Sequence, residues 1–224
     1  MTHPRCAGFA AGGALAIATL LPIGAQAIPL TPGELAAICA EAEDPPHCGR
    51  LVEVAQLRRL PNLAVRDGAS LKVALFPSGA ATFTDTEALN GGRSYSLWDY
   101  LNEINSVVLY TTDGDDVSFT LLQRATGRRT ELPSEPALSP DRLRLVTADF
   151  CATRCVNELS VWRVTRDDVR KEAWWKPPQP WADAVAAWKD SGTLVIEYTV
   201  AGAQARSRLE RRLADSGWVR TAAP

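Results

Sequence analysis

The chain has 224 residues, of which 46% are hydrophobic and 22% are charged, with 15 Gly and 15 Pro. This composition is that of an ordinary globular chain and excludes a disordered or fibrous one. The formal net charge is −2, so no overall field attracts nucleic acid or an anionic membrane, and we expect no nucleic-acid partner.

Residues 1–27 have the three parts of an export signal. Arg5 supplies a positive start, Cys6–Leu21 is an apolar run, and Ala25–Ala27 is a small-residue cleavage site. The apolar run is interrupted by glycines and is shorter than the roughly 20 residues that a membrane span needs. We therefore expect a signal peptide, a mature chain that begins near Ile28, no transmembrane segment, and a soluble protein that is periplasmic or secreted.

Residues 28–62 predict an N-terminal helical segment. Thr31 can cap a helix, Pro32 suits the first helical position, and Glu34 has the spacing of a capping box. A second helix is expected from about Gly49 to Pro61. The apolar stripe predicted for its inner face is Leu51, Val54, Ala55 and Leu57, and the residues predicted to face outward are Arg50, Glu53, Gln56 and Arg59.

From residue 63 to residue 224 the hydrophobic period changes to two, which predicts a β-rich domain of roughly ten to twelve short strands. Asp113-Gly114, Gly127 and Ser191-Gly192 are among the expected turns. The clearest strands are Leu71–Phe76, Ser106–Thr111, Val117–Leu122, Leu143–Ala148, Leu159–Val164 and Leu194–Val200.

Two stretches repeat approximately. Asp116–Leu132 contains a strand and a Thr-Gly turn, and Pro136–Asp141 is followed by the strand Arg144–Asp149. Over about residues 95–220 this pattern resembles the blades of TolB-like and WD-type β-propellers, in which an "SPDG" hairpin opens a blade. Arg142 stands where that family prefers glycine, and Trp188–Asp190 occupies the place of the proline motif in the later unit.

The resemblance implies how the remaining strands group and what the protein does. Asn157–Val164 and Val169–Trp175 would be outer strands of one unit, and protein interaction would be the function. The four strands expected in the following unit are Trp181–Trp188, Thr193–Val200, Arg206–Leu213 and Trp218–Arg220.

The spacing of the middle strands sets the number of blades. The separations between Val107, Leu145 and Leu194 are 38 and 49 residues, which fits about three blades, whereas closed propellers have four to eight. We expect a mainly β, propeller-like set of antiparallel sheets, with an edge covered by the Leu71–Thr84 hairpin and the helical pair or by a second chain. The alternative is a β-sandwich.

Four cysteines follow the predicted signal: Cys39, Cys48, Cys151 and Cys155. An even number in an exported chain indicates two disulfides. Three pairings exist, and we expect the local one, Cys39 with Cys48 and Cys151 with Cys155, because each pair is close in sequence and flanked by turn-forming residues.

Several kinds of catalytic and metal site find little support. His47 is the only histidine after the signal, no Gly-x-Ser-x-Gly motif is present, and disulfides would remove the thiols. Cys151 and Cys155 could hold copper or zinc, but no histidine follows them, and a disulfide is favoured. We assign no catalytic residue, no metal and no cofactor.

Carboxylates could also bind calcium or cleave glycosides. Asp113, Asp115 and Asp116 could bind calcium, but the pattern of a twelve-residue calcium loop is missing, which favours a solvated hairpin turn. Paired carboxylates for glycoside cleavage require a spatial arrangement that a sequence does not reveal, so no pair is named.

Tryptophan is abundant, with 7 in the chain, and Trp174, Trp175, Trp181 and Trp188 lie close together. If Trp174 and Trp175 share a strand, they point to opposite faces. One ring would pack between sheets, and the other would meet solvent, a neighbouring element or a ligand. We predict a contact surface that includes Trp174, Trp175 and Trp181, with packing in the core as the alternative.

Arginines cluster near the end of the chain, where Arg206, Arg208, Arg211, Arg212 and Arg220 outnumber Glu210 and Asp215. Arg208, Arg211 and Arg212 are candidates for binding an anionic glycan. Charged side chains also protect edge strands from unwanted pairing, and we favour that explanation.

The sequence therefore favours an exported, non-catalytic binding or assembly module whose partner is a protein, including a second copy of the chain. The alternative is a carbohydrate-binding protein or a carboxylate-dependent glycoside hydrolase. An acidic pair in the same cleft as an exposed tryptophan would favour the alternative, whereas a flat apolar patch would favour a protein partner.

Overall fold

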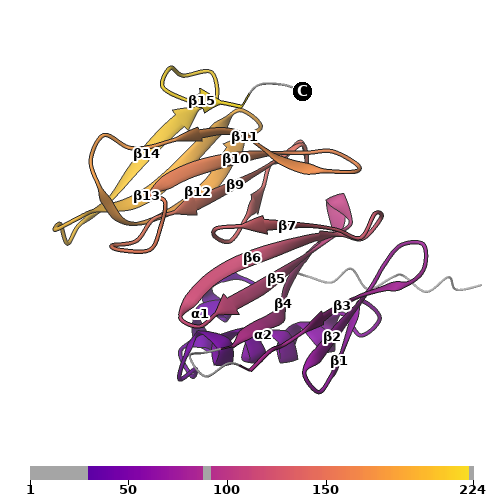
Figure 1. Cartoon of the computed structure of the whole chain (residues 1–224). Coiled ribbons are helices and arrows are strands. Elements are labelled where there is room, and N and C mark those ends of the chain that lie inside the picture. Colours follow the sequence, from indigo (N-terminus) through magenta and orange to yellow (C-terminus); the bar gives the residue numbers. More distant parts are fainter. Residues whose placement is uncertain (1–29, 88–91, 222–224) are drawn as a thin grey trace, which may run out of the picture.

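The computed structural model describes residues 30–87 and 92–221, so the predicted export signal lies outside the described residues. Two α-helices and fifteen strands are present in the described part, and the strands form four antiparallel sheets (Figure 1). A mainly β protein with an N-terminal helical pair is thereby confirmed. In that part of the chain, no helix is long and apolar enough to cross a membrane.

The helical pair consists of α1 (Pro32–Cys39) and α2 (Pro45–Arg59). The predicted capping box is present, because the Thr31 side chain accepts from the Glu34 N–H and the Glu34 carboxylate accepts from the Thr31 N–H. The second helix begins earlier than the predicted Gly49. Asp44 caps it by accepting from the His47 N–H at 2.8 Å, and prolines are tolerated in the first turn because its N–H groups have no helical partner.

The predicted inner face of α2 is wrong in part: Ala55 and Leu57 pack against the core, but Val54 does not, and Glu53 and Gln56 do not face outward. Glu53 and Gln56 are 2% exposed, whereas Val54 is 49% exposed. The cause is hydrogen bonding to the neighbouring strand: the Gln56 amide donates to the Trp98 carbonyl at 2.6 Å, and the Leu97 N–H donates to the Glu53 carboxylate at 2.9 Å. Polar side chains enter the interior here because their hydrogen-bonding groups are satisfied.

Sheet 1 comprises β1 (Ala64–Asp67), β2 (Ser70–Ala74) and β3 (Ala80–Thr84). Sheet 2 comprises β4 (Arg93–Leu101), β5 (Ser106–Asp113), β6 (Asp116–Gln123) and β7 (Arg128–Leu132), with the 3₁₀ turn η1 (Asn102–Ile104) after β4. Leu71 and Phe83 of sheet 1 share a core with Leu97, Leu109 and Leu122 of sheet 2. The predicted period of two thus reflects sheets that are packed face to face.

Sheet 3 comprises β8 (Ala137–Leu138), β9 (Arg144–Asp149), β10 (Glu158–Val164), β11 (Val169–Trp175) and β15 (Val219–Arg220). Its strand order is β15-β11-β10-β9-β8. Leu145 and Val169 pack with Phe119 and Leu132 of sheet 2. Its other face, which carries Val146, packs on sheet 4.

Sheet 4 comprises β12 (Trp181–Asp190), β13 (Thr193–Val200) and β14 (Arg206–Arg212). The expectation that Trp218–Arg220 would be its fourth strand is wrong, since Val219 and Arg220 pair with Trp174 and Ala173 of β11. Gly217, at φ +88°, precedes this segment and permits a turn that L side chains resist. The chain therefore returns to sheet 3 after leaving sheet 4.

Both disulfides are the local ones, Cys39–Cys48 and Cys151–Cys155, so the predicted pairing is confirmed. The first joins α1 to α2, and the second closes the loop between β9 and β10. Disulfides are consistent with an exported protein.

Candidate functional site

A pocket of about 340 Å³ opens between sheets 2 and 3. One wall is the end of β4 with η1, and the other is the turn that follows β8. We call it the inter-sheet pocket, and its lining residues are Asp99, Tyr100, Leu101, Glu103, Leu138, Ser139, Pro140 and Arg142.

A register shift in β4 shapes the first wall. The pairing with β5 is irregular between Leu97 and Asp99, and such bulges redirect side chains. Trp98 is 7% exposed and stacks on Tyr110 with ring centres 5.0 Å apart. Its indole N–H donates to the Glu135 carboxylate at 2.8 Å. The buried indole thereby holds Glu135, which precedes β8, next to β4.

Two carboxyl groups beside this wall have raised pKa values. Burial raises the pKa of the Asp99 carboxyl more than the Tyr100 N–H lowers it, and the charge of Glu103 raises it further. Desolvation by surrounding protein raises the pKa of the Glu135 carboxyl, the Trp98 N–H opposes this increase, and the charge of Asp99 adds to it. Asp99 and Glu135 thus disfavour each other's ionised form.

These carboxylates lack cationic partners. Among residues 30–87 and 92–221, no Lys, Arg or His nitrogen forms an ion pair with Asp99, Glu103 or Glu135. Asp99 is half-buried, whereas Glu103 and Glu135 are exposed. A cluster of carboxylates without counter-ions favours the approach of an external cationic group.

The second wall contains an arginine in an unusual backbone conformation. Asp141 fixes the turn by accepting from the Ser139 hydroxyl at 2.6 Å and the Leu143 N–H at 3.1 Å, and the first of these bonds is the main cause of its lowered pKa. Arg142 follows at φ +63°. Glycine adopts this conformation most easily. Here an exposed arginine lines the pocket instead.

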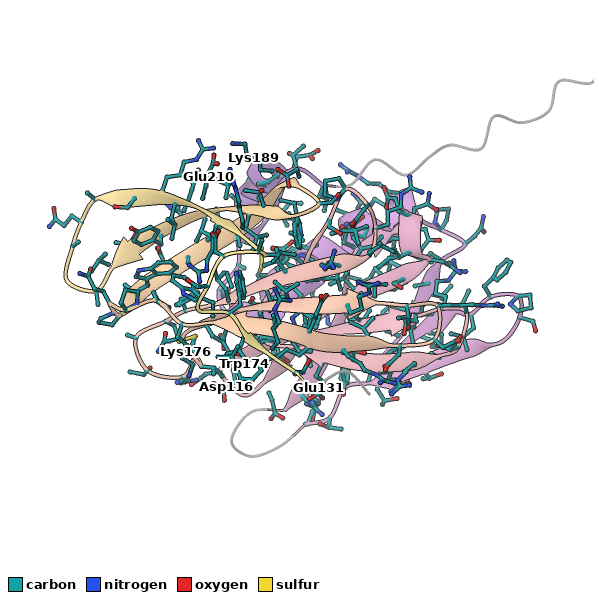
Figure 2. All side chains as sticks on the ribbon, turned by 90° about the horizontal axis from the view of Figure 1, so that it is seen from above. Asp116, Glu131, Trp174, Lys176, Lys189 and Glu210 are labelled. Atoms are coloured by element: carbon teal, nitrogen blue, oxygen red, sulfur yellow. A yellow bond between two sulfur atoms is a disulfide. The ribbon has the colours of Figure 1, made fainter. Side chains whose placement is uncertain are left out.

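The predicted tryptophans are divided between surface and core. Trp174 and Trp175 point to opposite faces of β11, as expected for neighbours in one strand. Trp175 and Trp181 are 9% and 5% exposed, and they pack in the core between sheets 3 and 4. Trp181 stacks on Tyr198 with ring centres 4.0 Å apart. Trp174 is half-buried on the other face (Figure 2). Its ring centre is 6.0 Å from the Lys171 amine.

The predicted arginines also lie on two faces. Arg208 and Arg212 lie opposite Glu197 and Thr193 on the outer face of sheet 4. Arg211 points to the inner face, where its guanidinium carbon is 4.2 Å from the Trp175 ring centre and 5.3 Å from that of Trp218. All three belong to β14, an edge strand, as the edge-protection explanation requires.

The acidic turn at Asp113–Asp116 connects β5 to β6. Asp115 and Asp116 pair with Arg154 at 3.5 and 2.9 Å, which ties this turn to the Cys151–Cys155 loop. Within the described ranges, no group of three or more His, Cys, Asp or Glu side chains could hold a metal ion. His47 lies in the first turn of α2, where its Nδ1 accepts from the Glu43 N–H at 3.2 Å.

The inter-sheet pocket was missed in the sequence. Asp99 is the one charged residue in the apolar and aromatic segment Leu97–Leu101, and this charge was the available indication. Arg142 lines the same pocket, and Glu135 lies near Asp99, only because sheet 3 folds onto sheet 2. Comparison with protein-family models, curated proteins and solved structures yields no match, so the functional argument rests on this geometry.

Proposed function

We propose that this protein is an exported, non-catalytic binding module, and that the inter-sheet pocket takes a basic side chain of a partner protein. The observation that carries the proposal is that Asp99 lines the pocket, half-buried and without a cationic partner among the described residues, with the Glu135 carboxylate near enough for the charge of Asp99 to raise its pKa.

A lysine or arginine side chain would satisfy both carboxylates at once. The attraction between opposite charges is stronger in a partly desolvated site than in water. A pocket of about 340 Å³ can receive one side chain of a partner, but it is too small to receive a folded protein surface. Leu101 and Leu138 can cover its aliphatic stem, while Arg142 stands at the rim for a carbonyl or carboxylate of the partner.

Short peptides test this proposal. Acetyl-Gly-Gly-Lys-Gly-Gly-amide is titrated into the disulfide-bonded chain, and backbone amide shifts are followed by NMR. We expect saturable shifts at Tyr100 and Leu138, absent with a norleucine or glutamate peptide.

Asp99→Asn and Glu135→Gln should abolish these shifts. Asp115→Asn is the matched control, because the Asp115 side chain is 88% exposed and lies outside the pocket. Equal binding of the norleucine peptide, or unchanged binding to Asp99→Asn, would refute the proposal.

Carbohydrate binding or carboxylate-dependent hydrolysis is a second candidate, and the specific observation for it is the same acidic pair. Tyr100 lines the pocket, but Trp98 is buried, so its ring offers no exposed stacking face. Titration with a mixture of short neutral oligosaccharides, followed by mass analysis for cleavage, distinguishes this candidate. Pocket shifts with sugars and none with the lysine peptide would favour it.

We also propose that the four sheets are an open arc of blades of the TolB-like and WD type. The support is that the sheets stack in chain order and that sheets 2 and 3 bury apolar residues on both faces, unlike the two sheets of a sandwich. An experimental structure in which sheet 4 packs directly on sheet 1 as one sandwich would contradict this arrangement.

A further inference from the structure

The strand β14 is an exposed edge of sheet 4. The strand order is β12-β13-β14, and β14 pairs with β13 alone in the described chain. Arg206, Ser207, Arg208 and Glu210 are all exposed. In Figure 1, β14 lies at the outer side of the upper group of sheets, and Glu210 with Lys189 lies on the opposite side of the molecule from Trp174 in Figure 2.

The hydrogen bonds of Arg212 show which backbone groups of β14 are free. The Arg212 N–H donates to the Asp215 carboxylate at 2.8 Å, and its carbonyl accepts from the Trp218 indole at 2.9 Å. Both groups therefore point away from β13. In an antiparallel ladder this direction alternates, so the backbone groups of Arg206, Arg208 and Glu210 point the same way.

The free edge consequently has two defined limits. It runs from Arg206 to Glu210, where the strand order places no neighbour. It ends at Arg212, because Asp215 and Trp218 already occupy the backbone groups there. An added strand could pair with three residues of β14, a length that gives several main-chain hydrogen bonds.

The side chains along this edge are charged, and some of them have no ion-pair partner among the described residues. Arg206, Arg208, Glu210 and Arg212 share the outer face. Lys189 already binds Glu210 at 2.8 Å, and Arg206 is 3.9 Å from Glu197. No acidic side chain in the described part of the chain lies within ion-pair distance of Arg208. Leu209, between Arg208 and Glu210 in the chain, points to the inner face and packs on the core between sheets 3 and 4.

We propose that β14 accepts an extended segment of a partner protein as an additional strand, with acidic residues at alternate positions and an apolar residue between them. The two acidic side chains would lie opposite Arg206 and Arg208, and the apolar side chain between them would lie opposite Ser207, on the face that carries Leu209. The same arginines disfavour pairing of two β14 strands, so they select an acidic segment over a second copy. This surface is separate from the inter-sheet pocket.

Hydrogen exchange provides the test. The disulfide-bonded chain is mixed with acetyl-Thr-Glu-Val-Glu-Val-Thr-amide, and amide exchange is followed by NMR. We expect at least tenfold slower exchange at Arg206, Arg208 and Glu210, and little change at Arg212, whose N–H is already bonded. A lysine version of the peptide and an acidic version with N-methylated glutamates should give no protection.

Two substitutions at one position separate charge from strand pairing. Arg208→Ala removes a charge and should lower the affinity for the acidic peptide about two- to fivefold, as for an exposed ion pair. Arg208→Pro also removes an N–H that points away from β13, which an edge strand tolerates, and should weaken binding at least tenfold more. Circular dichroism verifies that both variants fold.

Three results would overturn the proposal. One is loss of the strand-pairing effect: the N-methylated peptide binds as tightly as the acidic peptide, or the acidic peptide binds Arg208→Ala and Arg208→Pro equally. Another is salt-sensitive binding of the acidic peptide or of an anionic polysaccharide without amide protection, which would indicate a general anion surface. The third is protection at β14 that rises with protein concentration alone, which would indicate a second copy. Asp99→Asn should bind the acidic peptide normally, so a failure of the pocket proposal would be seen separately.

Discussion

Two groups of carboxylates in this molecule differ in their burial and in their partners. Glu53, at 2% exposure, accepts from both Nε and Nη2 of Arg66, at 2.8 and 2.7 Å, and from the Leu97 N–H. Asp85 completes this group by pairing with Arg50 and Arg66. Asp99 and Glu135 have no such cations among the described residues. A complete set of partners indicates a structural role, and an incomplete set points to a ligand.

The largest expected effect is on the Glu53 group. Glu53→Gln removes the negative charge and leaves Arg66 partly buried without its main partner, so the free energy of unfolding should fall by about 3 to 5 kcal/mol. Urea denaturation measures this change. Glu131→Gln, at an exposed carboxylate paired with Arg93, is the control and should change stability little. Equal effects of the two substitutions would remove the distinction between the two groups.

The second prediction concerns the pH dependence of binding at the inter-sheet pocket. A cationic side chain needs ionised carboxylates, and the pKa values of Asp99 and Glu135 are raised by desolvation. Affinity for the lysine peptide should therefore fall as pH drops through these raised pKa values, by about tenfold per pH unit below them. NMR titrations at several pH values measure it. Affinity that is constant from neutral to acidic pH would contradict a role for these carboxylates.

The third prediction concerns how the free energy of unfolding depends on pH. A raised pKa means that the folded chain binds protons more tightly than the unfolded chain. The resulting stability is present at low pH and is lost as pH rises from about 4 through the raised pKa values. Asp99→Asn and Glu135→Gln remove this loss. Both variants should be at least as stable as the parent at pH 7, and their stability should fall less between pH 4 and pH 7, as measured by urea denaturation. A large loss of stability at pH 7 would show that the two carboxylates are structural.

These contrasts also show what a sequence can predict. The capping box at Thr31, the local disulfides and the opposed rings of Trp174 and Trp175 were predictable, because each depends on neighbours in the chain. The inner face of α2 was not, because Glu53 is buried through contacts with β1 and β4 that hydrophobic periodicity does not report.

The candidate site was hidden for a related reason. Asp99 and Glu135 meet through the packing of sheet 3 on sheet 2 and through the Trp98 hydrogen bond. The strand β15 joins β11 because the chain turns at Gly217, and alternation within the strand gives no information about its partner. In both cases the sequence did not predict the feature because it depends on contacts between segments that are far apart in the chain.

The smallest effect is expected at an exposed, paired carboxylate. Lys189 binds both oxygens of Glu210, at 2.9 and 2.8 Å, with side chains that are 53% and 46% exposed. Solvent screens this pair, and ordering two long side chains opposes its formation, so Lys189→Ala should change stability by less than about 1 kcal/mol. Urea denaturation at low and high salt measures the change, and the difference should shrink as salt rises. A loss as large as that at Glu53 would show that the number of hydrogen bonds, rather than burial, determines what a carboxylate contributes to this fold.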